Sequence, residues 1–270
     1  MKNLFSSENL KLLEALSFTQ SLYAFDFDGT LSKIVQRSQD ATIVASTDAL
    51  LKQLSKHAPV AIISSRSIKD LKSRLKFIPP YLIGNHGLEG LGIRPDALDL
   101  AHKICANWKL YLEDHLPLES SGIAIEDKSF SLAIHYRKCS AKKKAKIDIL
   151  KIVSNLDPKP RIILGKCVIN LLPTGAPHKG VALVELMIQA EIKSALYIGD
   201  DDTDEDVFSL PNARILTVRV GKKATSQAQF YIEGQQEINR LLKTILQFYE
   251  SAKKKSRTEI ERKNSLYGNA

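Results

Sequence analysis

The sequence predicts an α/β fold, with a Rossmann-like parallel-sheet core, helices on both faces and an inserted α+β cap domain. Short apolar runs alternate with longer amphipathic stretches along the 270 residues, which is typical of a parallel sheet covered by helices. Several apolar runs end in polar residues, as strands do at the ligand-binding edge of such sheets. In the middle of the chain this alternation gives way to a strand-rich stretch, which predicts the inserted cap.

The expected elements follow this pattern along the chain. Core strands are expected at residues 22–26, 60–64, 82–83, 195–199 and 214–218, and core helices at 48–57, 68–75, 179–190 and 235–250. Cap strands are expected at 123–126, 130–137, 161–164 and 167–171, with a helix at 141–156. The core should therefore comprise 1–90 and 173–250, the cap 91–172, and a disordered basic tail 251–270.

The end of the first core strand carries the strongest functional signal. Residues 24–30 read Ala-Phe-Asp-Phe-Asp-Gly-Thr. Because residues i and i+2 of a strand point to the same side, Asp26 and Asp28 should project together. Two adjacent carboxylates repel each other, which favours a cation or a shared proton between them, and one could act as a nucleophile beside an acid/base partner. A strand ending in an acidic turn is the simpler alternative, but the preceding buried strand favours a site.

Three further segments complete this predicted site. Ser64 ends the second strand, where its hydroxyl could bind a phosphoryl oxygen or cap a helix. Lys179 lies near a helix start, which already favours anions, so it is a candidate for neutralising phosphate. Residues 200–206 contain six acids in seven positions; helix capping explains part of this run, whereas Asp200 at the strand tip suits a cation. Oxygen ligands without a His or Cys cluster favour Mg²⁺ over zinc.

Composition limits the partners. The net charge of +9 is concentrated in the helix after Ser140 and in the tail, without interleaved aromatics or a nucleic-acid-binding motif, so we expect no nucleic-acid partner. No apolar run approaches the roughly 18 residues of a membrane span. Three cysteines without metal-ligand spacing, and an N-terminus without a signal-like apolar stretch, predict a cytoplasmic protein. We expect a monomer.

The order and spacing of these segments resemble the haloacid-dehalogenase-like phosphohydrolases and, within them, the trehalose-6-phosphate phosphatases. The narrower resemblance rests on Ile-Gly-Asn-His-Gly-Leu-Glu at 83–89, Ile-Glu-Asp-Lys at 125–128, Leu-Ala-Ile-His-Tyr-Arg at 132–137 and the acidic run from Gly199 to Phe208. It extends from about Tyr23 to Tyr231. Two departures stand out. Ser65 replaces a glycine, and Asn170 and Leu172 replace an acid and a base of the family pattern.

The resemblance implies Mg²⁺-dependent hydrolysis of trehalose 6-phosphate through an aspartyl-phosphate. It assigns Asp26 as nucleophile, Asp28 as acid/base, and Ser64 and Lys179 as phosphoryl-binding groups. The implied metal site consists of Asp26, Asp28 through its carbonyl, and Asp200, with Asp201 and Asp204 close behind. The implied substrate-binding residues are Arg66, His86, Glu89, Glu126, Lys128, His135, Arg137 and Asn170.

Asn170 leaves the sugar open, because an amide is a weaker acceptor for sugar hydroxyls than a carboxylate. A phosphatase of another glycosyl phosphate, such as a glycosylglycerate phosphate, shares the same chemistry. A phosphosugar mutase would use the same aspartate pair. A non-enzymatic polyanion-binding protein is the alternative outside enzymes, and it rests on the +9 charge and the basic tail.

Overall fold

The core of the molecule is a parallel sheet. The computed structural model describes residues 1–35, 37–92, 95–165 and 167–267. These residues form a seven-stranded sheet in the order β1-β11-β10-β9-β2-β3-β4. The strands are β1 (Lys2–Asn3), β2 (Ser21–Phe25), β3 (Val60–Ile63), β4 (Tyr81–Ile83), β9 (Ser194–Gly199), β10 (Ile215–Val220) and β11 (Phe230–Ile232). The five expected core strands are confirmed to within two residues, whereas β1 and β11 are too short to have shown a pattern.

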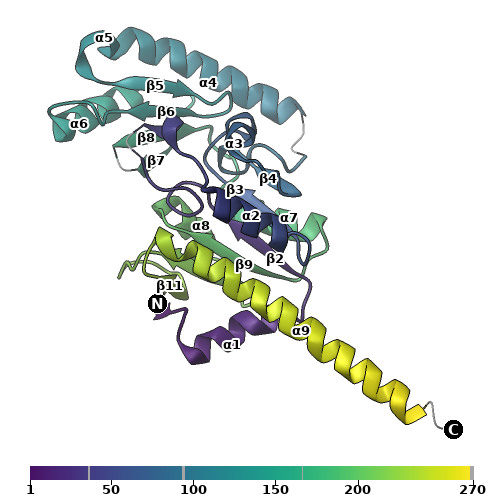
Figure 1. The fold of residues 1–270 in the computed structure, drawn as a ribbon. Coiled ribbons are helices and arrows are strands. Elements are labelled where there is room, and N and C mark those ends of the chain that lie inside the picture. The colour runs from purple at the N-terminus through teal and green to yellow at the C-terminus, as the bar shows by residue number, and fades with distance from the viewer. Residues whose placement is uncertain (36, 93–94, 166, 268–270) are drawn as a thin grey trace.

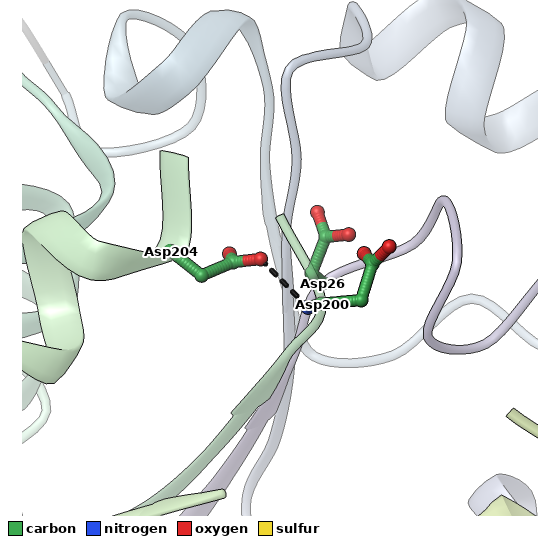
Figure 2. Close-up of side chains that lie close together, drawn as sticks. All are labelled: Asp26, Asp200 and Asp204. Atoms are coloured by element: carbon green, nitrogen blue, oxygen red, sulfur yellow. Dashed lines mark hydrogen bonds between the residues drawn. The ribbon is translucent and has the colours of Figure 1, made fainter. Parts of the chain in front are cut away.

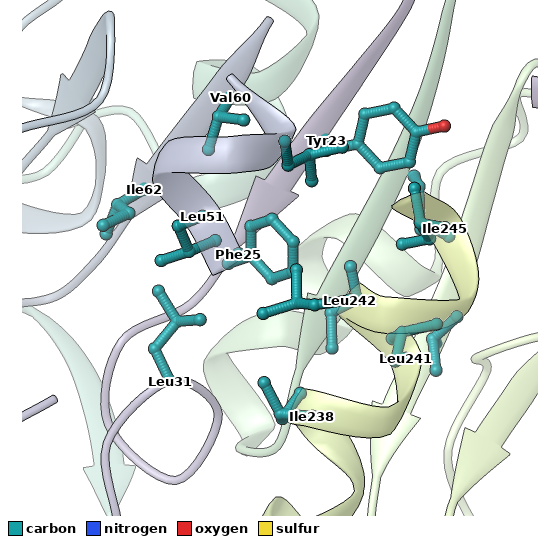
Figure 3. Packing of buried hydrophobic residues seen from close by; sticks show 14 of the residues in the cluster. Tyr23, Phe25, Leu31, Leu51, Val60, Ile62, Ile238, Leu241, Leu242 and Ile245 are labelled. Atoms are coloured by element: carbon teal, nitrogen blue, oxygen red, sulfur yellow. The ribbon is translucent and has the colours of Figure 1, made fainter. Parts of the chain in front are cut away.

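Helices cover both faces of this sheet (Figure 1). On one face lie α1 (Ser7–Leu16), α2 (Ala45–Leu54), α3 (Ile68–Arg74) and α9 (Ile238–Tyr267); on the other lie α7 (Lys179–Gln189) and α8 (Glu205–Phe208). Figure 3 shows the first face, where Leu241 and Leu242 of α9 pack near Phe25 of β2. Both faces are therefore buried, which explains why the central strands read as continuous apolar runs.

The C-terminal helix differs from the prediction. A helix over 235–250 followed by a disordered tail was expected, but α9 begins at Ile238 and continues to Tyr267. The stretch from Ser251 to Tyr267 is rich in lysine, arginine and glutamate, which are good helix formers. It contains no glycine or proline, the residues that most often end a helix. Figure 1 shows it extending well beyond the rest of the core. Residues 268–270 lie outside the described part of the chain.

A second, antiparallel sheet forms between the two halves of the core sequence. Its order is β5-β6-β8-β7, with β5 (Ala124–Asp127), β6 (Leu132–His135), β7 (Arg161–Gly165) and β8 (Val168–Leu172). One face packs on α4 (Pro95–His115) and α6 (Lys142–Val153), and a short α5 (Leu118–Ser121) lies between them in the chain. The long helix α4 was not predicted. The core meets the other side of this sheet, which we call the cap sheet (Figure 1).

Short 3-10 helices complete the connections: η1 (Ser38–Asp40), η2 (Asn85–Gly87), η3 (Asp202–Asp204) and η4 (Gln235–Glu237). Two of them, η2 and η3, follow β4 and β9 and so lie at the carboxyl edge of the core sheet. Within the described residues, no helix is long and apolar enough to cross a membrane.

Candidate active site

The carboxyl ends of β2 and β9 bring two aspartates together. These strands are neighbours, with Phe25 opposite Ile198, so Asp26 and Asp200 follow adjacent strand ends. Figure 2 shows their carboxyl groups next to each other, with Asp204 beside them. One oxygen of each of the three carboxylates lies within 4.8 Å of the others. Gly29, at φ +80°, makes room for Asp200, because a Cβ there would lie 2.0 Å from its Oδ2.

Lys179 neutralises two of these carboxylates. It is the first residue of α7, and its buried Nζ lies 2.8 Å from Asp26 Oδ1 and 2.7 Å from Asp204 Oδ1. Burial alone would lower the pKa of Lys179, but the two carboxylates raise it above its ordinary value, so the side chain stays charged. Residues far apart in sequence thus form the buried centre of the site, and the predicted proximity of Lys179 to Asp26 is observed.

Asp204 organises the loop that carries Asp200. Its Oδ1 also accepts a hydrogen bond from the Tyr197 hydroxyl at 2.7 Å, and its Oδ2 accepts from the backbone amides of Asp200 and Asp201 at 2.9 Å each. Both oxygens of Asp204 are therefore engaged by donors from the protein. Asp201 is turned away toward solvent and caps η3, where its Oδ1 accepts from the Asp202 amide at 2.7 Å.

Three other acids of the 200–206 run each pair with a basic side chain. Asp202 pairs with Lys223, Glu205 with Arg219 at 3.1 Å, and Asp206 with Arg161 at 3.0 Å. Asp200 differs. Its Oδ1 is buried without a hydrogen-bond partner among the described residues. Much of the acidic run therefore has a structural explanation, and the unexplained charge is concentrated on Asp200.

The residues at this position fit a divalent cation. Burial raises the pKa of Asp26 to about 8, with Lys179 opposing and Asp204 adding to the shift. Burial and the charge of Asp26 likewise raise the pKa of Asp200 to about 9. A buried and a half-buried carboxyl group that are both costly to ionise, the second with an orphaned buried oxygen, are what a hard cation would stabilise. The cluster of Asp26, Asp200 and Asp204 consists of oxygen ligands alone, which suits Mg²⁺.

The carboxylate of Asp28 is bound by Arg66. Arg66 Nε is 2.6 Å from Asp28 Oδ2, and Nη2 is 2.7 Å from Oδ1. The same guanidinium binds Asp70 through Nη1 at 2.7 Å. Arg66, predicted to bind substrate, is therefore held by two acids of the core, and the side chain of Asp28 remains 37% exposed.

Ser64 and the η2 loop lie beside Arg66. Ser64 is fully buried, and its Oγ accepts from the Arg66 amide at 3.2 Å. The next strand, β4, leads into Asn85 and His86, both with positive φ (48° and 59°), a backbone region that non-glycine residues seldom adopt. His86 is 1% exposed, and its Nε2 has no hydrogen-bond partner among the described residues. Burial and the nearby charges of Lys128, Lys179 and Arg161 hold the pKa of His86 well below its ordinary value.

Glu89 holds the η2 loop through hydrogen bonds to its carboxylate. Its Oε2 accepts from the Ile68 amide at 2.6 Å and its Oε1 from Asn85 Nδ2 at 2.5 Å. Asn85 also donates to the Lys128 carbonyl at 2.8 Å and accepts from Ser131 Oγ at 2.8 Å, so it connects the core to the cap hairpin between β5 and β6. Glu89 was predicted to contact substrate, and the hydrogen bonds of its carboxylate hold the loop that carries His86.

The cap sheet turns a polar row toward the core. Leu132, Ile134, Ile169 and Leu171 face α4 and α6, so the alternate positions face the other way. Glu126 lies opposite Ala133, and Ala133 lies opposite Asn170, which places Glu126 and Asn170 in one row on that second face. On the same face, His135 Nε2 is 2.7 Å from Glu126 Oε2. The structure thus brings together three of the predicted sugar-binding residues.

The other two predicted cap residues contact the core backbone. Lys128 Nζ is 3.3 Å from the Ser65 carbonyl, near the residues that follow β3. Arg137 Nη1 donates to the Val35 carbonyl at 2.9 Å. Both side chains therefore bridge the two sheets.

Sequence reasoning missed Asn85, Tyr197 and Arg161. Asn85 was considered only as part of a motif. The hydrogen bonds that its side-chain amide makes to the cap could not be predicted from its neighbours in the sequence. Tyr197 lies within an apolar strand and resembled a core residue. Arg161 was interpreted only as the start of a strand. Its ion pair was missed because its partner, Asp206, is 45 positions away in the sequence.

Comparisons with known proteins agree with this geometry. A family model described as trehalose-phosphatase matches residues 24–236. A trehalose-phosphate phosphatase of Mycobacterium ulcerans is 32% identical over 236 residues, which is 82% of this chain and 60% of that protein. An uncharacterized glycosyl hydrolase of Mycobacterium tuberculosis is 36% identical over 68% of this chain but only 15% of its own length. The chain thus spans less than two thirds of these relatives.

A solved structure extends the likeness to the fold. The C-terminal domain of Candida albicans trehalose-6-phosphate phosphatase superposes with a TM-score of 0.69 at 22% identity, covering 88% of this chain and 96% of that one. At this identity the comparison supports the fold alone.

Proposed function

Because the chain belongs to the trehalose-phosphatase family, we propose that it hydrolyses trehalose 6-phosphate to trehalose and phosphate. The observation that supports this most is the buried pair of Asp26 and Lys179, 2.8 Å apart at the carboxyl edge of the sheet. A carboxylate that is held in place by a charged ammonium, beside a second acid on the same strand end, is equipped to attack a phosphate ester.

The proposed reaction has two steps. A carboxylate oxygen of Asp26 attacks phosphorus, the bond from phosphorus to the sugar oxygen breaks, and Asp28 gives its proton to that oxygen. Water then attacks the aspartyl-phosphate and gives a proton back to Asp28, which releases phosphate and restores Asp26. Lys179 and Ser64 bind the phosphoryl oxygens, with the ammonium of Lys179 neutralising charge that develops during transfer.

We infer that Mg²⁺ binds at Asp26 and Asp200, with the backbone carbonyl of Asp28. The orphaned Oδ1 of Asp200 supports this assignment most strongly. Bound there, Mg²⁺ would offset negative charge on the phosphoryl group and the aspartates. Asp204 would support the site by positioning the Asp200 backbone, since its oxygens already accept hydrogen bonds from Lys179, Tyr197 and two amides.

The sugar would lie against the inner face of the cap sheet. Glu126 and His135 would bind its hydroxyls there, as would Asn170, while Lys128 and His86 would line the side nearer Lys179. Asn170 supports a second candidate, a phosphatase of another glycosyl phosphate, because the family pattern has an acid at that position. That the protein is a cytoplasmic monomer remains an expectation from its sequence.

Replacement of the nucleophile tests this proposal. Asp26→Asn keeps an oxygen to accept the Lys179 hydrogen bond but is a far poorer nucleophile, so phosphate release from trehalose 6-phosphate should vanish while the melting temperature stays within a few degrees. Retention of more than about a tenth of wild-type activity would exclude Asp26 as nucleophile. Ser209→Ala, at an exposed position that directly follows α8, is the control and should retain full activity.

A further inference from the structure

The cap sheet is attached to the core at both of its edges. At the β5 edge, the hairpin after Asp127 is bound by Asn85 through the Lys128 carbonyl and Ser131. At the opposite edge, β7 begins with Arg161, whose Nη2 lies 3.0 Å from Asp206 Oδ2 on α8. Both attachments lie at the same end of the sheet, because Leu132, Leu171 and Ile162 are consecutive partners across it.

Arg161 is placed to reach the core by its strand register. It pairs with Leu172 across β7 and β8, and directly opposed residues project from the same face of a sheet. Ile163, two residues on, pairs with Asn170, so Arg161 lies on the face that carries the polar row. Leu172 is fully buried and occupies the position where the family pattern has a base. Arg161 therefore supplies a cation from the adjacent strand, next to the position that lacks one.

Asp206 lies next to the segment that carries Lys179. A Cβ on Gly180 would lie 2.2 Å from the Asp206 carbonyl oxygen, so α8 packs directly against the first turn of α7. That turn begins with Lys179. His178, which caps α7 through the Gly180 and Val181 amides, has its Nδ1 3.8 Å from Asp206 Oδ2. A contact to Asp206 therefore ties the cap to the same segment that holds Lys179 against Asp26.

We propose that the Arg161–Asp206 ion pair holds the β7 edge of the cap sheet on the core, and that Arg161 is thereby a positioning residue for the sugar-binding row. A sheet held at one edge can tilt about that edge, whereas a sheet held at both edges keeps Glu126 and Asn170 at a fixed distance from Lys179. The inference rests on the proposed function only for the choice of substrate.

A charge swap tests this role. The four proteins are the intact chain, Arg161→Glu, Asp206→Arg and the double variant Arg161→Glu/Asp206→Arg. Arg240→Glu, which reverses an ion pair of 3.0 Å with Glu237 on the core surface, is the matched control. Each is assayed with trehalose 6-phosphate and with p-nitrophenyl phosphate, an ester without a sugar, and its radius of gyration is measured by small-angle X-ray scattering.

Each single reversal turns attraction into repulsion, so kcat/KM for trehalose 6-phosphate should fall about tenfold, with p-nitrophenyl phosphate within about threefold. The radius of gyration should rise, and the double variant should recover both values. Arg240→Glu should change neither. Loss that the double variant does not recover would mean that Arg161 contacts the sugar itself, which overturns the proposal. An equal loss on both esters, or no loss, also overturns it.

The scattering measurement separates this inference from the proposed function. If the intact chain does not hydrolyse trehalose 6-phosphate, the proposed substrate is wrong, and the radius of gyration still decides the role of the pair. A larger radius of gyration in both single variants, with the original value restored in the double variant, would support the proposed role of the ion pair. An unchanged radius in the single variants would refute that role.

Discussion

Arg66 donates two hydrogen bonds to the carboxylate of Asp28, from Nε to Oδ2 at 2.6 Å and from Nη2 to Oδ1 at 2.7 Å. The two residues follow neighbouring strands, β2 and β3, and Arg66 is itself fixed by Asp70 at 2.7 Å. The proposed acid/base of the reaction therefore has its carboxylate oriented by a side chain that was expected to bind substrate. Arg66 on this account acts through Asp28.

Replacing Arg66 with lysine should lower kcat at least about tenfold, since an ammonium cannot make the planar two-nitrogen contact that orients Asp28. KM for trehalose 6-phosphate should change little. Steady-state kinetics of Arg66→Lys measure this. Arg74→Lys is the matched control, because Arg74 binds Asp70 at 2.6 Å but does not contact Asp28. A rise in KM at unchanged kcat would instead identify Arg66 as a substrate ligand.

Removing Mg²⁺ by chelation should stop hydrolysis, and adding it back should restore hydrolysis. The melting temperature is a second readout, which does not depend on activity. Mg²⁺ should raise it in the intact chain, because the cation relieves the repulsion between Asp26 and Asp200. Asp200→Asn should abolish that rise and stabilise the metal-free protein. Asp202→Asn, which alters an exposed acid paired with Lys223, should leave the Mg²⁺ effect intact. An Mg²⁺-dependent rise that persists in Asp200→Asn would place the cation elsewhere.

His86 should make stability depend on pH. Its pKa in the folded protein is well below the ordinary value of 6.5, chiefly through burial. Below that ordinary value the unfolded chain binds a proton that the folded chain does not, so this stability is present above about pH 6.5 and is lost as the pH falls, by up to about 1.4 kcal/mol per pH unit.

Melting temperatures at pH 7.5 and 5.5 measure this effect. Asp26 and Asp200, whose pKa values are raised, oppose this loss in both proteins, so the prediction is a difference between variants. On going from pH 7.5 to 5.5, the melting temperature of the intact chain should fall by a few degrees relative to that of His86→Asn, since asparagine tolerates a positive φ and does not titrate. His102→Asn, at an exposed position of α4, should show the same pH response as the intact chain. The same pH response in His86→Asn and the intact chain would show that His86 makes no such contribution.

The sequence was sufficient for the features that rest on local pattern. The central strands were predicted within two residues because both faces of the sheet are buried, and Asp26 and Asp200 were found because each follows such a strand. The long helix α4 was missed, and its outward-facing Leu100 and Leu110 blur the apolar face by which an amphipathic helix is recognised.

What the sequence did not reveal depends on contacts between distant residues. Helix capping was expected to explain part of the acidic run from Asp200 to Asp206, but its ion pairs could not be predicted, because Lys179, Arg219, Lys223 and Arg161 lie far from it in the sequence. Likewise, nothing local to Arg66 or Glu89 distinguishes a residue that binds substrate from one that orients Asp28 or holds the Asn85 loop.

The most direct test of the account is phosphate release by the intact chain with Mg²⁺, measured as kcat/KM for trehalose 6-phosphate and for glucose 6-phosphate. Each cap hydrogen bond that the monosaccharide leaves unmade in a closed site costs about 1–3 kcal/mol, so trehalose 6-phosphate should be preferred by on the order of a hundredfold or more. Equal hydrolysis of the two esters would contradict the assignment of trehalose 6-phosphate as substrate, and no phosphate release from either would contradict the proposed sugar-phosphate phosphatase.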